Sequence, residues 1–219
     1  MKQNILFDLD GTITDPFEGI TKAVAYALRK FGIDISDRTQ LRSFIGPPLR
    51  DSFMHDFSFS IEQADEAIRY YREYYSKTGI YECYVYDGIE SLFSLLCEKG
   101  ARIVMATSKP EPFAAELMRH FGLDSYFYRI VGASFDYSRA RKTDVIGAAI
   151  EECEISDIRT AIMVGDREFD IQGAASFGMA GIGVSYGYGS REELIAAGAV
   201  AVCESVAQLK DVLLSEKTL

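Results

Sequence analysis

The sequence predicts an α/β fold, in which a parallel β-sheet is covered by helices on both faces. Short apolar runs of strand length alternate with segments of helical periodicity, each of about 8 to 12 residues. Strands buried on both faces are typically continuous apolar runs, and parallel strands need a long crossover, usually a helix. One long stretch after the first apolar run departs from this alternation and shows helical patterns only. These observations predict a parallel sheet core with an inserted helical segment.

Taken in chain order, the apolar runs predict strands at residues 5–7, 103–105, 130–131, 161–164, 181–184 and 200–202. The segments between and after them predict helices at residues 89–98, 112–121, 143–153, 171–177, 192–197 and 206–214. Each helix is long enough to cross back over the sheet, so consecutive strands can run parallel.

The stretch from Phe17 to Tyr84 has no convincing strand. In its first part, apolar residues recur at helical spacing, and Gly32 marks the end of that helix. In residues 61–75, tyrosines lie four residues apart and so share one face of a helix. We therefore expect residues 1–15 and 85–219 to form the α/β core. Residues 16–84 are expected to form a small all-helical domain inserted after the first strand.

The composition bounds the class of protein. Hydrophobic residues make up 48% and charged residues 26% of the chain, the balance of a soluble globular protein. The chain shows neither a membrane-length apolar run nor a signal-peptide pattern near Met1, so we expect no membrane partner and a cytoplasmic location. The net charge of −10 argues against nucleic acid, which needs basic surface.

The cysteines and histidines exclude several chemistries. Cys83, Cys97, Cys153 and Cys203 are scattered without a Cys-x-x-Cys pair, so we expect them to be reduced and mostly buried. His55 and His120 lie in no metal-ligand spacing. Phosphohistidine enzymes and histidine-bound zinc sites are therefore poor candidates.

An acidic segment, Asp8-Leu9-Asp10-Gly11-Thr12, follows the first strand. Residues two apart in an extended chain point the same way, so the two carboxylates repel each other unless a cation or a shared proton intervenes. Gly11 permits a sharp turn, and Thr12 can direct its hydroxyl toward the carboxylates. An ordinary acidic turn is the alternative. A calcium loop is excluded, because glycine comes at the fourth position and not at the sixth.

Polar residues also follow the expected strand at residues 161–164. Asp166 comes at its carboxyl end, and Asp170 is four residues further on. Ligands of open parallel sheets bind at this edge, where these groups would meet Asp8 and Asp10. Oxygen ligands without histidine or thiolate suit Mg²⁺. Taken alone, the pair could instead be a helix N-cap and a solvated side chain.

Two further segments could bind an anion. Thr107-Ser108-Lys109 ends the strand at 103–105, where hydroxyls and backbone N–H groups can bind phosphate, although Ser108 could simply cap a helix. A basic cluster at residues 139–144, which contains Arg141 and Lys142, precedes another helix. Its alternative is a solvated basic loop.

These motifs together resemble the haloacid dehalogenase superfamily, specifically its phosphoglycolate-phosphatase-like branch with a helical C1-type cap. Residues 8–12 with Asp15 match the first motif, Thr107 the second, Lys142 the third, and Gly165-Asp166 with Asp170 the fourth. The segments 45–49 and 186–190 are also similar to that branch. The resemblance covers nearly the whole chain and implies a Rossmann-like core with a cap domain at residues 16–84.

The resemblance implies a role for each matching residue. Asp8 would be the nucleophile and Asp10 the general acid and base. Mg²⁺ would be held by Asp8, Asp166 and the backbone carbonyl of Asp10. The other expected roles are phosphate binding (Gly11, Thr107, Ser108, Lys142), support of the metal or the lysine (Thr12, Asp170) and substrate selection (Gly46, Pro47, Pro48, Leu49).

The sequence departs from the family pattern at a few positions. Thr143 follows Lys142 where proline is common, so Lys109 and Arg141 compete with Lys142 for the phosphate. Ser108 stands where relatives often carry asparagine, and Arg167 stands where a small hydroxyl residue is common. These departures leave the core chemistry in place but make the transfer of a substrate from any relative unsafe.

The implied function is a Mg²⁺-dependent phosphatase that acts on a small phosphorylated metabolite through an aspartyl-phosphate intermediate. Phosphoglycolate-like compounds and nucleotide 5′-monophosphates are the expected substrates. A sugar-phosphate mutase, a dehalogenase and a non-enzymatic phospho-acceptor domain remain as alternatives. The sequence does not distinguish a monomer from a dimer.

Overall fold

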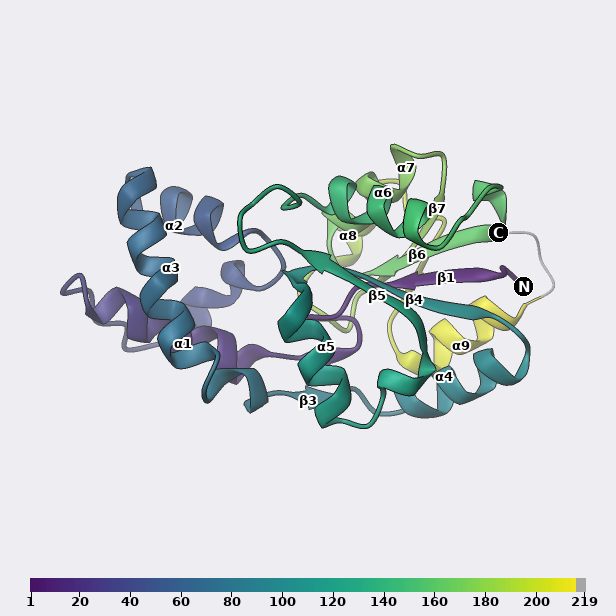
Figure 1. Ribbon diagram of the computed structural model, residues 1–219, viewed down its shortest axis with the longest axis horizontal. Coiled ribbons are helices and arrows are strands. Elements are labelled where there is room, and N and C mark those ends of the chain that lie inside the picture. The colour runs from purple at the N-terminus through teal and green to yellow at the C-terminus, as the bar shows by residue number, and fades with distance from the viewer. Residues whose placement is uncertain (216–219) are drawn as a thin grey trace. The chain divides into compact units, whose positions relative to one another are not determined.

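The structure is a computed structural model that describes residues 1–215 (Figure 1). Its internal contacts divide the chain into two compact units. One unit joins Met1–Asp15 to Val85–Leu219, and the other is Pro16–Tyr84. We call the first the core unit and the second the inserted unit, and each is described by itself.

The core unit is built on a six-stranded sheet in the order β5-β4-β1-β6-β7-β8. All neighbouring strands in it run parallel. The strands are β1 (Asn4–Phe7), β4 (Arg102–Pro110), β5 (Phe127–Ala133), β6 (Ala161–Gly165), β7 (Ala180–Val184) and β8 (Ala201–Cys203). The predicted α/β class with a parallel sheet is confirmed.

Helices cover both faces of this sheet, as Figure 1 shows. On one face lie α4 (Ile89–Glu98), α5 (Glu111–His120) and α9 (Val206–Leu214), with the short turn η3 (Asp124–Tyr126). On the other lie α6 (Lys142–Glu152) and α7 (Glu168–Ala175). The turn η4 (Ile158–Thr160) precedes β6, and α8 (Arg191–Ala196) packs beside β7 and β8. Each helix follows a strand, as right-handed crossovers of parallel strands require.

Strand β1 lies at the centre of the core unit and is fully buried on both faces. Leu6 points into the cluster that contains Val104, Val145 and Met163, below α6 and α7. Phe7 points to the opposite face, where its ring meets that of Phe93 edge-on at 5.1 Å. Burying such a side chain stabilises a fold by about 1.5–3 kcal/mol. The end of β1 is therefore a rigid place from which to direct a side chain.

The inserted unit is helical within its own bounds. It contains α1 (Phe17–Arg29), η1 (Arg38–Phe44), α2 (Leu49–Phe57), α3 (Ile61–Tyr75) and η2 (Gly79–Tyr81). Its interior is an aromatic cluster in which the rings of Phe44 and Phe53 lie 4.9 Å apart. The Ser60 hydroxyl accepts a bond from the Gln63 N–H and so begins α3. Two short strands that the sequence did not predict, β2 (Thr14–Asp15) and β3 (Tyr84–Val85), form a separate two-stranded sheet.

Two expectations about single features need correction. Cys153 and Cys203 are buried, but Cys97 is exposed and Cys83 only half-buried, so the cysteines are not mostly buried. All four are reduced, as expected. Ser108 does not cap α5, because β4 continues to Pro110, which is itself the residue before the helix. Within residues 1–215, no helix is long and apolar enough to span a membrane.

Candidate active site

Three strand ends meet at one edge of the core sheet. In the register of the sheet, Phe7 of β1 pairs with Met105 of β4 and with Val164 of β6. The Asp8 N–H continues this pairing by donating to the Val164 carbonyl at 2.9 Å. The residues that follow each strand are therefore brought together, which places Asp8 between the Thr107 and Asp166 segments.

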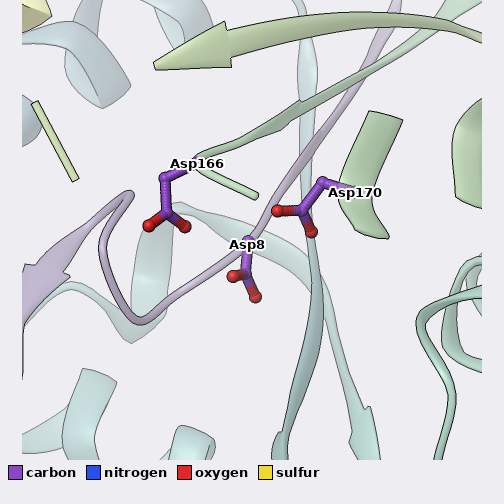
Figure 2. A group of neighbouring side chains, drawn as sticks. All are labelled: Asp8, Asp166 and Asp170. Atoms are coloured by element: carbon purple, nitrogen blue, oxygen red, sulfur yellow. The ribbon is translucent and has the colours of Figure 1, made fainter. Parts of the chain in front are cut away.

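Three carboxylates gather at this edge (Figure 2). Asp8 ends β1, Asp166 follows β6 and Asp170 lies in the first turn of α7. One oxygen of each lies within 4.8 Å of the others, and all three side chains are buried. Burial, followed by the nearby carboxylates, raises the pKa of Asp166 well above its usual range. Burial also raises the pKa of Asp170 to about 6, against the effect of Lys142.

Lys142 is the buried cation of this carboxylate cluster. Its Nζ lies 2.7 Å from Oδ1 of Asp8 and 2.7 Å from Oδ1 of Asp170, and it donates to the Ala106 carbonyl at 3.1 Å. Burial by itself lowers the pKa of Lys142, but the carboxylates of Asp170 and Asp8 outweigh it and the net pKa is raised. Lys142 therefore carries a positive charge.

The charges of the cluster fit a divalent cation. When all three carboxylates are ionised, Lys142 compensates one charge and leaves two uncompensated in a buried site. Uncompensated buried charge is costly unless it is paired or coordinates a metal. The donors are hard oxygens, with neither histidine nor thiolate among them. This donor set suits Mg²⁺ and similar ions.

Asp10 lies in a different environment from Asp8. Its Oδ2 accepts from Nζ of Lys109 at 2.5 Å, and Lys109 is itself buried. Its Oδ1 is buried and has no hydrogen-bond partner within the described part of the chain. Burial raises the pKa of Asp10 despite Lys109, and Asp8 adds to the rise. One buried carboxyl oxygen of Asp10 is thus available to exchange a proton with a ligand.

The turn after Asp10 depends on glycine. Gly11 has a φ of +86°, and its N–H donates to the Thr14 carbonyl at 2.7 Å. A Cβ at Gly11 would lie 2.1 Å from Oδ2 of Asp166. The Thr12 hydroxyl is 3.4 Å from Oδ1 of Asp166, whereas the sequence predicted that it would turn toward Asp8 and Asp10. The loop therefore folds directly onto Asp166.

The expected phosphate-binding residues differ in their burial and in their contacts with Asp8 and Asp10. Thr107 is buried, and its hydroxyl accepts from the Lys109 N–H at 3.2 Å. Ser108 is half-buried. Of the three competing cations, Lys142 contacts Asp8, Lys109 contacts Asp10, and Arg141 is exposed just before α6. The geometry thus favours Lys142 over Arg141 beside the expected nucleophile.

The four residues expected to select the substrate belong to the inserted unit. Gly46 has a φ of +107°, Pro47 and Pro48 follow it, and Leu49 begins α2. Their role remains a prediction.

From the sequence, residues 186–190 were noted only for their similarity to the family branch and were given no place in the site. The loop between β7 and α8 contacts Asp166, because the Tyr188 N–H donates to Oδ2 of Asp166 at 2.8 Å. On the adjoining helix, Glu193 accepts from Nε of Arg167 at 3.0 Å and from the Glu168 N–H at 2.9 Å. The alternation of Gly187 and Gly189 with tyrosines was the available signal, since paired glycines mark a close backbone approach.

Comparison with known families decides which kind of enzyme carries this site. The family model described as haloacid dehalogenase-like hydrolase matches residues 5–184, which include every aspartate and lysine of the cluster. The chain belongs to this family. The predicted resemblance is confirmed.

Relatives of this haloacid dehalogenase-like hydrolase point to phosphate chemistry. A 5′-nucleotidase from Pseudomonas aeruginosa is 45% identical, covering 96% of this chain and 95% of its own. The crystal structure of a predicted phosphatase from Clostridium acetobutylicum superposes with a TM-score of 0.95 at 48% identity, over 98% of this chain and 99% of that one. This haloacid dehalogenase-like hydrolase is a phosphatase.

A third relative carries a different name. The tyrosine-protein kinase PtkA of Mycobacterium tuberculosis is 38% identical over 85% of this chain and 63% of its own length. The same fold and a related sequence are therefore found in a protein named for transfer of phosphate to tyrosine.

Proposed function

We propose that this phosphatase hydrolyses a small phosphomonoester in a Mg²⁺-dependent reaction, with Asp8 as the nucleophile. The observation that supports the proposal is the buried cluster of Asp8, Asp166 and Asp170 around Lys142, which leaves two negative charges to be compensated when all three carboxylates are ionised. A divalent cation and a phosphate bound beside a rigidly held carboxylate would use every group of the cluster.

In the first step, a carboxylate oxygen of Asp8 attacks phosphorus. A bond forms between that oxygen and phosphorus, and the bond from phosphorus to the ester oxygen breaks. Lys142, which is held against Asp8 at 2.7 Å, offers positive charge beside the incoming phosphoryl group. Thr107 and Ser108 are the proposed partners of the phosphoryl oxygens. Gly11, whose N–H donates to the Thr14 carbonyl, would act by shaping the loop beside the phosphate.

Asp10 handles the proton in both steps. Its raised pKa favours the protonated form, which gives its proton to the departing alcohol. The resulting carboxylate then removes a proton from water, the water oxygen bonds to phosphorus, and the bond between phosphorus and Asp8 breaks. Inorganic phosphate leaves, and Asp8 and protonated Asp10 are restored. The buried Oδ1 of Asp10 is the proposed site of exchange.

Asp8, Asp166 and the backbone carbonyl of Asp10 are the proposed ligands of Mg²⁺. Asp170 would support the site indirectly by holding Lys142, whose Nζ lies 2.7 Å from Oδ1 of Asp170. When bound, the ion offsets the repulsion between the Asp8 carboxylate and the phosphate dianion.

For the substrate, we propose a nucleoside 5′-monophosphate, with a phosphoglycolate-like compound as the alternative. Support comes from the relative named 5′-nucleotidase, whose similarity extends over nearly the full length of both chains. The core cluster does not choose between these substrates, because it would contact only the phosphate that they share.

The kinase-named relative supports a second candidate, transfer of the phosphoryl group to a tyrosine. The same Asp8 intermediate would then pass its phosphoryl group to a phenol oxygen in place of water. A mutase would pass it to a second hydroxyl of a sugar phosphate. Product analysis separates the three, because only hydrolysis releases inorganic phosphate.

The test is phosphate release from 5′-AMP, 5′-GMP, 5′-UMP, phosphoglycolate and glucose 6-phosphate, each with Mg²⁺ or with EDTA. We expect Mg²⁺-dependent release that is highest for a nucleotide and lost in Asp8→Asn. Asp211→Asn, which changes an exposed carboxylate on α9, is the matched control and should keep full activity. Undiminished turnover in Asp8→Asn would refute the nucleophile. Phosphotyrosine formed from ATP, without phosphate release from any monoester, would favour the second candidate.

A further inference from the structure

The loop at residues 185–190, between β7 and α8, is pressed against the main chain of the aspartate cluster. The Tyr188 N–H donates to Oδ2 of Asp166 at 2.8 Å. A Cβ on Gly187 would lie 2.5 Å from Cβ of Asp166 and 2.3 Å from the Gly11 carbonyl oxygen. A Cβ on Gly189 would lie 2.0 Å from the backbone oxygen of Asp166. Because backbone packs on backbone with no slack, Asp166 cannot shift unless this loop shifts with it.

The two tyrosines of the same loop, Tyr186 and Tyr188, contact the two segments of the core unit that connect to the inserted unit. The Tyr188 hydroxyl donates to Oδ1 of Asp15, the last residue of the core unit before the insertion. The Tyr186 hydroxyl donates to the Thr12 carbonyl at 3.0 Å. Its ring packs edge-on against that of Tyr86, just after the chain returns, at 4.9 Å.

The two departing segments, residues 12–15 and 85–87, are also joined to each other. The Tyr86 N–H donates to the Ile13 carbonyl at 3.0 Å. Burial raises the pKa of Tyr186, so its hydroxyl stays protonated and remains a donor at all ordinary pH values. The loop at 185–190 thus contacts Asp166 through its backbone and both departing segments through its side chains.

We propose that Tyr188 is a positioning residue that couples cation binding at Asp166 to the ordering of the two departing segments. Tyr188 spans both sites by itself, since its N–H holds Asp166 and its hydroxyl holds Asp15. The inference rests on the proposed cation site. A cation that fixes the Asp166 carboxylate also fixes the Tyr188 amide, and the Tyr188 ring carries that restraint to Asp15. Coupling between two sites is reciprocal, so ordered departing segments also favour the cation.

The experiment is backbone hydrogen exchange with and without Mg²⁺ on the whole protein, together with its melting temperature. Tyr188→Phe removes the hydroxyl and keeps both the backbone donor and the ring. Tyr128→Phe, on an exposed tyrosine of β5, is the matched control. In the wild type and the control, Mg²⁺ should slow exchange in residues 163–170, and about fivefold or more in residues 12–15 and 85–87. In Tyr188→Phe, protection should remain at 163–170 and at 12–13, where Thr12 contacts Asp166 directly. Protection of residues 14–15 and 85–87 should fall below roughly twofold.

Each other outcome has a distinct meaning. If Tyr188→Phe keeps the wild-type response at residues 14–15 and 85–87, the coupling is refuted. If Mg²⁺ protects residues 163–170 of the wild type but not the departing segments, the coupling is also refuted and the cation site stands. If Mg²⁺ neither slows exchange nor raises the melting temperature, the proposed cation site fails and the coupling fails with it. Should Tyr188→Phe not fold, Asp15→Ala removes the same bond from its other end and must give the same loss.

Discussion

Asp8 and Asp10 are two residues apart and yet occupy different environments. Asp8 shares Lys142 with Asp170 in the carboxylate cluster, whereas Asp10 pairs with Lys109 and keeps one oxygen without a hydrogen-bond partner among the described residues. The two lysines come from different elements, the start of α6 and the end of β4. This separation places Lys142 against one carboxylate, while burial raises the pKa of the other.

Lys142 should be essential for stability as well as for activity. Lys142→Met removes the buried cation and leaves Asp8 and Asp170 without it. Breaking a buried ion pair on one side costs about 3 kcal/mol or more, and we expect that loss in the free energy of unfolding in metal-free buffer. Urea denaturation measures it, with Lys210→Met on the exposed side of α9 as the control. An unchanged urea midpoint would show that Lys142 is not the counterion.

Binding of Mg²⁺ should depend on pH through the raised carboxyl pKa values. Burial raises the pKa of Asp170 from 3.8 to about 6, so in metal-free protein the folded state keeps a proton that the unfolded chain loses. This contribution to stability is complete at low pH and is lost as the pH rises through about 6. The positive charge of Mg²⁺ at the proposed site beside Asp170 would disfavour that proton, so the rise in melting temperature on adding Mg²⁺ should be small at about pH 5 and larger at about pH 7.5. Asp170→Asn should flatten this dependence, and an equal Mg²⁺ effect at both pH values in the wild type would contradict it.

The sequence predicted most of the residues that gather at this edge, because strand ends of a parallel sheet must meet there. It could not predict which lysine faces which carboxylate. Lys109 lies at an irregularity in β4, where the register with β5 shifts between Thr107 and Pro110, and strict alternation of side chains does not apply across such a shift. The sequence also predicted only a supporting role for Asp170, while the structure brings the Asp170 carboxylate within 4.8 Å of the carboxylates of Asp8 and Asp166.

At the scale of the elements, the loop at 185–190 has no room for a side chain at Gly187 or Gly189. Gly187→Ala would place a Cβ 2.3 Å from the Gly11 carbonyl oxygen, which is backbone and cannot rotate away. We expect a loss of about 1–3 kcal/mol in stability and a fall in Mg²⁺-dependent activity, because both Asp166 and Gly11 must move. Thermal unfolding and phosphate release measure the two effects.

The matched control for that variant is Gly147→Ala in the middle of α6. Its nearest neighbour is the far end of the Phe177 ring at 3.1 Å, and that ring can shift because it is partly exposed. Helix propensity favours alanine there by up to about 1 kcal/mol, so stability should hold or rise. Equal losses of stability and of activity from Gly187→Ala and Gly147→Ala would show that the close backbone approach at Gly187 is not what these measurements report.

The strands of the core sheet were predicted best where burial is complete. Strands β1 and β6, fully buried in the centre of the sheet, were found near their predicted bounds. Strand β5 was predicted only at residues 130–131 but extends from Phe127 to Ala133. It is an edge strand, and exposed residues such as Tyr128 and Arg129 break the apolar run on which the prediction depended. The short strands β2 and β3 were not predicted, because a strand of two residues is too short to show an alternating pattern.

At the scale of the whole molecule, we propose that the core unit performs the reaction and the inserted unit selects the substrate. The double variant Pro47→Ala/Pro48→Ala frees the φ angles that precede α2. We expect kcat/KM for the best nucleotide to change by about tenfold, the size of effect that a few pocket contacts produce. Activity on p-nitrophenyl phosphate, a small generic substrate, should change less than about threefold. Equal changes on both substrates would remove these prolines from substrate selection.

The covalent intermediate on Asp8 is the central claim, and trapping it is the most direct test. The Asp10→Asn variant, which cannot activate water, is mixed with ³²P-labelled p-nitrophenyl phosphate, whose leaving group needs no proton from Asp10, then quenched in acid and digested with trypsin. We expect label on the peptide of residues 3–22, removable by hydroxylamine as an acyl phosphate is, and absent when Asp8→Asn is added to Asp10→Asn. Label on a tyrosine peptide that resists hydroxylamine, or label that persists without Asp8, would contradict it.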